Sequence, residues 1–268
     1  MVGRKLDNAY PKEEVPLGDV ALEVEHFSMK RIFDDVSFSV RKGEIVGFAG
    51  LVGAGRTETM RAMYGLDPHD SGTIKLNGKE VTIKNPMDSI KQGMIMLSED
   101  RREYGLIPVR SVRENASIAN LASYIYGGYT HKKKEEEEVE EMFKKMEVKT
   151  PSLETPISSI NQTVGSLSGG NQQKVVLAKW MLTQPDVLIL DEPTRGIDVG
   201  AKFEIYKLMT DMAKEGKAVV MVSSEMAELI GMCDRIYIMC QGRITGCLNR
   251  DEFSQETIMK YATNLMNL

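Results

Sequence analysis

Two stretches of the sequence decide the fold. The first is Ile45-Val-Gly-Phe-Ala-Gly50-Leu-Val-Gly-Ala-Gly55-Arg-Thr57, and the second is Val187-Leu-Ile-Leu-Asp191-Glu192. Each begins with an apolar run of strand length. The first run continues into a glycine-rich turn and a helix predicted from about Thr57 to Tyr64, and the second ends on two carboxylates. This pattern predicts an α/β fold with a phosphate site at the ends of its strands.

The glycine-rich turn has the spacing G-x-x-x-x-G-[K]-[ST], except that Arg56 stands where lysine is expected. Glycines let backbone N–H groups approach a phosphate, and the positive end of the following helix attracts the anion. We expect the Thr57 hydroxyl to bind Mg²⁺. Arg56 keeps the positive charge, but its guanidinium is bulkier than a lysine amine. Taken alone, the motif is also compatible with a glycine turn that binds nothing.

The two carboxylates at the end of the second stretch have separate expected roles. Asp191 should lie near the Mg²⁺ held at a neighbouring strand end. Glu192 can orient and deprotonate an attacking water. A turn with two solvated acids is the alternative, and it fits poorly with a phosphate loop in the same chain.

A third motif is Leu167-Ser-Gly-Gly-Asn-Gln-Gln173, followed by a helix predicted from Val175 to Leu182. Serine and two glycines before a helix favour a second anion-binding helix start. One phosphate loop already accommodates one nucleotide, so this second loop suggests a nucleotide held by another subunit. An N-cap with a flexible turn is the alternative for this motif alone.

The surrounding chain is organised as one domain with an insertion. Residues 1–18 are predicted to be a linker or tail, and 19–268 the domain. Strands that alternate with helices predict a mostly parallel core sheet. Asn77-Gly78 between two short runs predicts an antiparallel hairpin. A helical stretch, roughly 112–182, forms an inserted helical subdomain at about 110–180.

Composition narrows the class of protein. The 268 residues include 42% hydrophobic and 27% charged residues, which is typical of a globular chain. The net charge of −5 argues against nucleic acid as a partner. There is no apolar run of signal-peptide or membrane-span length, so a cytoplasmic chain is expected. The charged run 132–145 is interpreted as a solvated helix over a core stripe of Val139, Phe143 and Met146, rather than a partner-binding face.

Taken together, the motifs resemble the ATP-binding cassette family over residues 19–268. The resemblance narrows to the second cassette of tandem ATPases that drive ribose, xylose and galactose importers. It rests on the phosphate loop 50–57, Ser98-Glu-Asp-Arg-Arg102, LSGGNQQK at 167–174, DEPTRGIDVGAK at 191–202 and Ser223-Ser-Glu-Met226.

The resemblance implies a set of site residues, with ATP and Mg²⁺ as the bound groups. Glu192 would be catalytic, and Thr57 and Asp191 would bind the metal. The nucleotide-binding residues would be Gly50, Leu51, Val52, Gly53, Ala54, Gly55, Arg56, Thr57, Glu58, Ser168, Gly169, Gly170, Asn171, Gln172, Asp198 and Ser224. No clear adenine-stacking aromatic is found, and Phe27 is expected to be core.

The resemblance also implies partners. These are the first cassette of the same parent protein, membrane permease subunits and, indirectly, a periplasmic-type sugar-binding protein. The chain would lie peripherally on the inner face of the cell membrane. Within this group, 1–6 resembles the linker between the two cassettes.

Three departures from the family pattern leave two alternatives open. Arg56 replaces the lysine, Leu97-Ser98-Glu99 stands in place of a glutamine, and Ser224 replaces the switch histidine. The first alternative is a degenerate half that binds nucleotide, does not hydrolyse it and completes the partner site. The second, less favoured, is a cassette ATPase of DNA repair or translation.

Overall fold

The computed structural model describes residues 10–149 and 160–263, which fall into two compact units. The first unit consists of the residues up to Met96, Asp186–Pro193 and the residues from Tyr206 onward. The second consists of Leu97–Pro185 and Thr194–Ile205. The described part of the chain contains no helix with the length and apolar composition needed to cross a bilayer.

The first unit carries both large sheets. Its strands are β1 (Val20–Met29), β2 (Phe33–Arg41), β3 (Ile45–Gly50), β4 (Ser71–Leu76), β5 (Lys79–Val81), β6 (Met94–Leu97), β9 (Val187–Asp191), β10 (Ala218–Val222), β11 (Arg235–Cys240) and β12 (Arg243–Asn249). Its helices are α1 (Arg56–Tyr64), α2 (Pro86–Lys91), α8 (Met226–Met232), η5 (Arg250–Glu252) and α9 (Gln255–Ala262). Helix α7 (Val199–Lys214) begins in the second unit and ends in the first.

The central sheet confirms the predicted parallel core. Among the described residues its order is β12-β11-β3-β10-β9-β6, and β11, β3, β10 and β9 run parallel. Val222 of β10 pairs with both Phe48 and Asp191. This register brings the carboxyl end of β3, where the glycine-rich turn begins, to the same sheet edge as Asp191.

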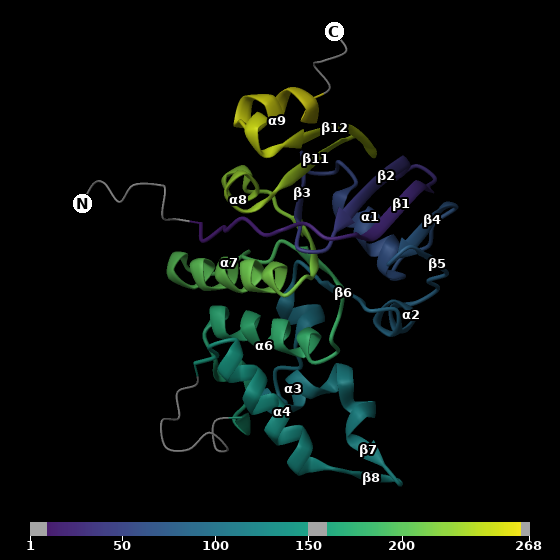
Figure 1. The fold of residues 1–268 in the computed structure, drawn as a ribbon. Helices are drawn as coiled ribbons and strands as arrows, with labels where there is room; N and C mark the ends of the chain where they lie inside the picture. Colours follow the sequence, from purple (N-terminus) through teal and green to yellow (C-terminus); the bar gives the residue numbers. More distant parts are fainter. Residues whose placement is uncertain (1–9, 150–159, 264–268) are drawn as a thin grey trace, which may run out of the picture. The chain divides into compact units, whose positions relative to one another are not determined.

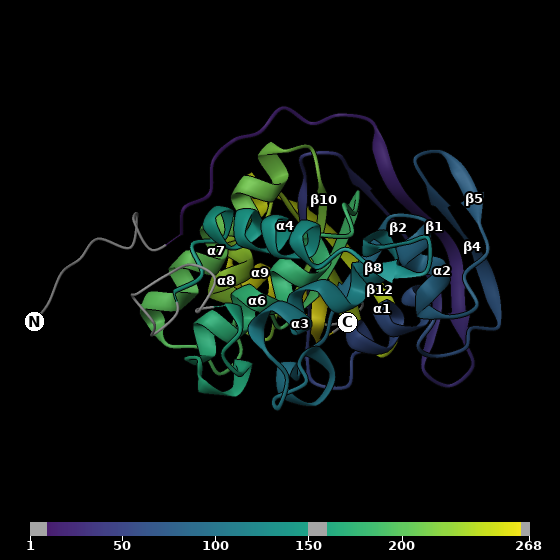
Figure 2. The ribbon, with the colours of Figure 1, turned by 90° about the horizontal axis from the view of Figure 1, so that it is seen from below.

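The second sheet of this unit is antiparallel, in the order β2-β1-β4-β5 (Figure 2). Asn77 and Gly78 connect β4 to β5 with φ of 48° and 76°. Two successive positive φ angles are those of a type I′ turn, so the predicted hairpin is confirmed. Phe27 is fully buried against Phe33, which confirms that it is core.

The second unit is mainly helical. Its elements are η2 (Arg101–Gly105), α3 (Val112–Ser117), η3 (Ile118–Tyr124), β7 (Ile125–Tyr126), β8 (Tyr129–Thr130), α4 (Lys132–Lys145), η4 (Val164–Ser166) and α6 (Gly169–Met181). Helices α3, α4 and α6 pack together (Figure 1). Val139, Phe143 and Met146 are all buried, which confirms the core stripe predicted beneath the charged run.

Two sequence predictions in this unit are wrong. The stretch predicted to be helical contains the antiparallel pair β7–β8, because Gly127 and Gly128 both adopt positive φ and turn the chain back. Helix α6 begins at Gly169 rather than Val175. The helix starts earlier because Ser168 caps it, its hydroxyl accepting from the Asn171 N–H.

Residues 10–18 form no helix or strand, and they contact later parts of the first unit. Lys12 Nζ lies 2.8 Å from Asp234, and the Tyr10 ring lies 5.3 Å from that of Tyr206. The remainder of the predicted linker, 1–9, lies outside the described residues. The linking role of the segment therefore stays a prediction.

Candidate functional site

The glycine-rich turn connects β3 to α1 within the first unit. Gly50 has no room for a side chain, since a Cβ there would lie 2.6 Å from the Met239 carbonyl oxygen and 2.9 Å from Ala54 Cβ. Gly55 is the N-cap of α1, with φ of 95° and no side-chain hydrogen bond to the first turn. The N–H groups that begin α1 at Arg56 and Thr57 are thus left without a side-chain cap, as a phosphate-binding helix start requires.

Arg56 forms a hydrogen bond at the carboxyl end of the neighbouring strand β10. Its Nη1 donates a hydrogen bond of 2.8 Å to the carbonyl oxygen of Ser223, which directly follows β10. Burial lowers the pKa of the guanidinium, and the charges of Glu192 and Asp191 oppose this shift. Arginine stays protonated in proteins, so the guanidinium places a positive charge beside these two acids.

Thr57 and Asp191 meet as the sequence predicted. Thr57 Oγ1 donates to Asp191 Oδ1 at 3.3 Å. Asp191 is 1% exposed, and its Oδ2 is buried with no hydrogen-bond partner among the described residues. Burial raises the pKa of Asp191 to about 6, while the Thr57 hydrogen bond acts in the opposite direction. An unpartnered buried carboxylate oxygen is costly unless another group binds it.

This pair fits a magnesium ion. Carboxylate and hydroxyl oxygens are hard ligands, and Mg²⁺ commonly takes one or two from the protein and the rest from phosphates and water. Within 10–149 and 160–263, no cluster of three His, Cys, Asp or Glu residues has the arrangement to hold a metal by itself. Binding of Mg²⁺ here would depend on Thr57, Asp191 and a nucleotide phosphate.

Glu192 has an unusual backbone and a defined partner. Its φ is 48°, a left-handed conformation that is rare outside glycine and is often found at functional sites. Its Oε2 accepts a hydrogen bond of 3.2 Å from Ser224 Oγ. Burial raises the pKa of the half-buried Glu192 carboxyl, and the Ser224 hydrogen bond opposes that shift. A carboxyl with a raised pKa at a strand end is suited to accept a proton from water.

The sequence did not single out the supports behind these residues. Ser223 Oγ donates to Glu228 Oε2 at 2.8 Å, and Tyr206 Oη donates to Glu228 Oε1 at 2.7 Å. Glu228 is 1% exposed, so it is a buried anchor for the segment that carries Ser224. In the sequence, only the motif Ser223-Ser-Glu-Met226 indicated this region. The Ser223 carbonyl that binds Arg56 could not be predicted, because every residue has a backbone carbonyl group.

The other predicted residues of the glycine-rich turn and of α1, which are Leu51, Val52, Gly53, Ala54 and Glu58, lie in the first unit, whereas those of the motif at 167–173 lie in the second. Ser168 is exposed at the start of α6, and a Cβ on Gly170 would lie 2.5 Å from that of Ala201. Asn171 Oδ1 accepts from the Lys149 N–H at 2.8 Å, and the buried Gln172 donates to the Leu167 carbonyl at 3.1 Å. The side chains of Asn171 and Gln172 are thus engaged within their own unit.

Asp198 and the segment in place of the family glutamine also belong to the second unit. Asp198 Oδ1 accepts from the Ala201 N–H at 3.0 Å, which caps the start of α7. Glu99 forms an ion pair with Arg195. This ion pair joins the segment 97–99, where the glutamine is absent, to the loop before Asp198.

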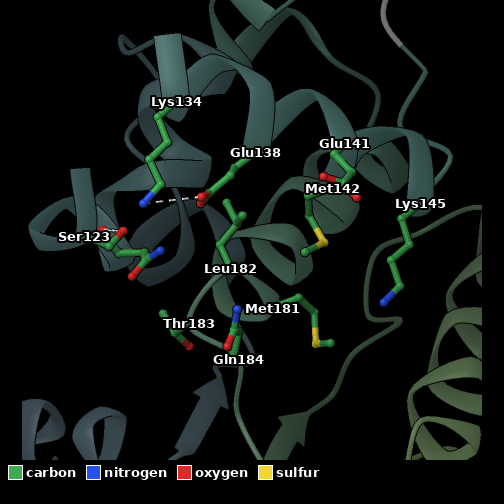
Figure 3. Close-up of a pocket in the computed structure, with 11 residues that line it drawn as sticks. Ser123, Lys134, Glu138, Glu141, Met142, Lys145, Met181, Leu182, Thr183 and Gln184 are labelled. Carbon is green, nitrogen blue, oxygen red and sulfur yellow. Dashed lines mark hydrogen bonds and ion pairs between the residues drawn. The ribbon is translucent and has the colours of Figure 1, made fainter. Parts of the chain in front are cut away.

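The second unit also contains a cavity of about 590 Å³ between α4, η3 and the end of α6 (Figure 3). Lys134 and Glu138 lie 3.7 Å apart on its wall, and Met142 and Met181 also line it. None of the predicted site residues lines this cavity.

Comparisons with solved structures agree with this fold. An ATP-binding cassette of an ABC transporter superposes with a TM-score of 0.76 at 18% identity, covering 91% of this chain and 99% of the other. The protein cbiO1 from Clostridium perfringens, part of an ABC transporter complex, superposes with a TM-score of 0.74 at 21% identity, covering 92% and 96%.

Comparisons of sequence are more specific. The ribose import ATP-binding protein RbsA of Oceanobacillus iheyensis is 51% identical over 98% of this chain. The galactose/methyl galactoside import ATP-binding protein MglA of Clostridium tetani is 48% identical over 99% of this chain. The chain spans about half the length of these relatives, 52% of each. The model of the ABC transporter family matches residues 33–195, and the chain therefore belongs to that family.

Proposed function

We propose that this chain is a nucleotide-binding domain of a monosaccharide importer, and that it binds MgATP at Gly50–Glu58 and Asp191. The single observation that carries this proposal is the buried, unpartnered Asp191 Oδ2 beside the Thr57 hydroxyl, at the start of a helix whose N–H groups have no side-chain cap. A sugar is proposed as the cargo because related proteins are named for ribose and galactose import.

Each group of this site has a defined task. The loop N–H groups and Arg56 bind the phosphates. Bound Mg²⁺, held by Thr57 and Asp191, supplies positive charge that offsets the charge of the phosphates. Glu192 accepts a proton from the attacking water, and Ser224 orients the Glu192 carboxylate through its hydrogen bond.

The chain spans about half the length of its relatives, which supports a tandem arrangement. We place this chain second because its motifs at 167–174 and 191–202 resemble those of second cassettes. In that arrangement Ser168, Gly169, Gly170 and Asp198 contact ATP held by the first cassette. Ser168 and Asp198 are exposed, as such a role requires. Permease subunits on the inner face of the membrane and a sugar-binding protein complete the system.

A second candidate is a half that binds nucleotide without hydrolysing it. It is favoured by the Arg56 hydrogen bond to the Ser223 carbonyl, which directs part of the guanidinium away from the phosphate loop. Ser224 also lacks the positive charge of a histidinium. The retained Glu192 with its raised pKa argues for slow hydrolysis instead.

Steady-state ATP hydrolysis by the full-length protein tests these candidates. The first-cassette site is inactivated by replacing its own catalytic carboxylate, so that only the site on this chain remains. Residual turnover that Glu192→Gln abolishes supports catalysis here. Nucleotide binding without such turnover supports the second candidate, and absence of MgATP binding contradicts both.

A further inference from the structure

Arg101 links the segment η2, in which it lies, to a loop of the second unit that is 94 and 95 positions further along the chain. Its Nη1 donates to the Arg195 carbonyl at 2.9 Å, and its Nη2 donates to the Gly196 carbonyl at 3.3 Å. We call residues 195–198 the Arg195 loop. A planar guanidinium with two terminal donors is well suited to hold two neighbouring carbonyl groups, and a lysine amine is not.

The same guanidinium lies against the start of the signature loop, residues 167–173. A Cβ built on Gly169 would lie 2.8 Å from Arg101 Nη2 and 3.6 Å from the Gly196 carbonyl oxygen. Real Cβ atoms do not approach nitrogen so closely, so a side chain at 169 requires the guanidinium to move. Gly169 is therefore the residue that lets Arg101 reach the Arg195 loop.

The segment that carries Arg101 is itself held at both ends. Asp100 caps η2, and its Oδ1 accepts from the N–H groups of Arg102 and Glu103 at 2.8 and 3.1 Å. At the other end, buried Lys179 of α6 donates to the Gly105 carbonyl at 2.8 Å. Segment η2 is π-helical, a rare conformation that is often found at functional sites.

Charge pairing does not explain the position of Arg101. Among the described residues, Arg101 forms no ion pair, and its Nε is buried without a hydrogen-bond partner. Burial lowers the pKa of the Arg101 guanidinium, and the charge of the neighbouring Asp100 opposes this shift without a direct ion pair. The two carbonyl groups are therefore the hydrogen-bond partners that hold the guanidinium in place.

We propose that Arg101 is a positioning residue that holds the Arg195 loop and the signature loop in one fixed arrangement, in which they together meet the nucleotide of the partner cassette. The inference rests on the proposed function, because it requires that these loops act on a nucleotide bound elsewhere. Arg101 itself need not touch the nucleotide, since it acts through Gly169 and the two carbonyl groups.

Kinetics of the full-length protein test this role. Arg101→Ala should lower kcat about tenfold, the size of one lost charged hydrogen bond, while KM for ATP changes less than twofold. Arg101→Lys should recover little, and millimolar guanidinium added to Arg101→Ala should restore turnover where equal concentrations of methylammonium do not. Lys133→Ala, which removes a charge that is 91% exposed, is the control and should leave turnover unchanged. Full activity of Arg101→Ala or Arg101→Lys overturns the inference.

A double-mutant cycle of Arg101→Ala and Gly169→Ala tests the contact between the two residues independently of the single-variant kinetics. Gly169→Ala should lower kcat more in the wild-type background than in the Arg101→Ala background, since the 2.8 Å conflict is absent from the latter. Any loss that remains without Arg101 reports the direct contact of Gly169 with the nucleotide. Additive effects would contradict the contact.

Hydrogen exchange of the nucleotide-free full-length protein separates this inference from the proposed function. Arg101→Ala should speed amide exchange in 195–200 and 169–172. If Ser168→Arg abolishes turnover but Arg101→Ala changes neither turnover nor exchange, the positioning role is wrong and the proposed function stands. If Ser168→Arg leaves turnover unchanged, the proposed function is wrong and the inference falls with it.

Discussion

Thr57 Oγ1 donates a hydrogen bond to Asp191 Oδ1 across 3.3 Å, joining the first turn of α1 to the end of β9 over 134 positions of sequence. The other oxygen of Asp191 is buried and has no hydrogen-bond partner in the described chain. Without a bound group, only one of the two Asp191 carboxylate oxygens therefore has a hydrogen-bond partner.

Thr57→Ala should weaken nucleotide binding about tenfold in the presence of Mg²⁺ and much less in its absence, because the hydroxyl is a proposed metal ligand. Titration calorimetry with ATP, in Mg²⁺ and in EDTA, measures both affinities. Thr57→Ser keeps the hydroxyl and serves as the matched control. Equal losses in the two conditions would count against the ligand role.

Asp191→Asn should remove a pH-dependent destabilisation of the metal-free protein. The folded pKa of about 6 lies above the ordinary aspartate value of 3.8, so the native state holds this proton more tightly than the unfolded state. The buried carboxyl therefore lowers stability progressively as pH rises from about 4 to about 6, by an amount on the order of 2–3 kcal/mol.

The measurement for Asp191 is chemical denaturation of wild type and variant at several pH values without Mg²⁺. The stability advantage of Asp191→Asn should grow over that window and then level off. Asp19→Asn, the same exchange at an exposed position, is the control. A constant difference at every pH would disprove the linkage.

Ser224→Ala should move the acidic limb of the pH–rate profile to higher pH. The Ser224 hydrogen bond lowers the pKa of Glu192, whereas burial raises it. Loss of this hydrogen bond therefore raises the pKa further, and a larger fraction of the Glu192 carboxyl is protonated at a given pH. The profile of kcat/KM for hydrolysis at this site measures the shift. Ser224→Thr retains the hydroxyl and should keep the wild-type limb, and an unshifted Ser224→Ala profile would exclude Glu192 as the base.

In the full-length protein, Ser168→Arg should reduce ATP hydrolysis and sugar uptake more severely than Glu192→Gln. The reason is that Ser168 is proposed to complete the first-cassette site, whereas the site on this chain carries Arg56 and Ser224 and is expected to turn over about ten- to a hundredfold more slowly. Ser166→Arg, at an exposed serine two residues away, is the control. Near-normal activity of Ser168→Arg would refute the ranking.

The sequence by itself determined the local units of this protein. The apolar run into the turn at Gly50–Thr57, the strand that ends on Asp191 and the Asn77-Gly78 hairpin are confirmed, because strand periodicity, positive-φ glycines and turn chemistry act over a few neighbouring residues. Local signals were misread where two glycines break a helical stretch at 127–128, and where Ser168 starts α6 earlier than its apolar pattern indicates.

Only the tertiary structure decided which of these units meet. Strand order places β10 between β3 and β9, and that order brings Arg56 to the Ser223 carbonyl and Ser224 to Glu192. The Arg101 contacts with the Arg195 loop likewise span 94 and 95 positions. Hydrophobic periodicity specifies which face of a strand is buried but not which strand lies beside it. The carbonyl groups that accept these hydrogen bonds occur in every residue, so the sequence cannot identify them. These contacts therefore follow from the packed chain alone.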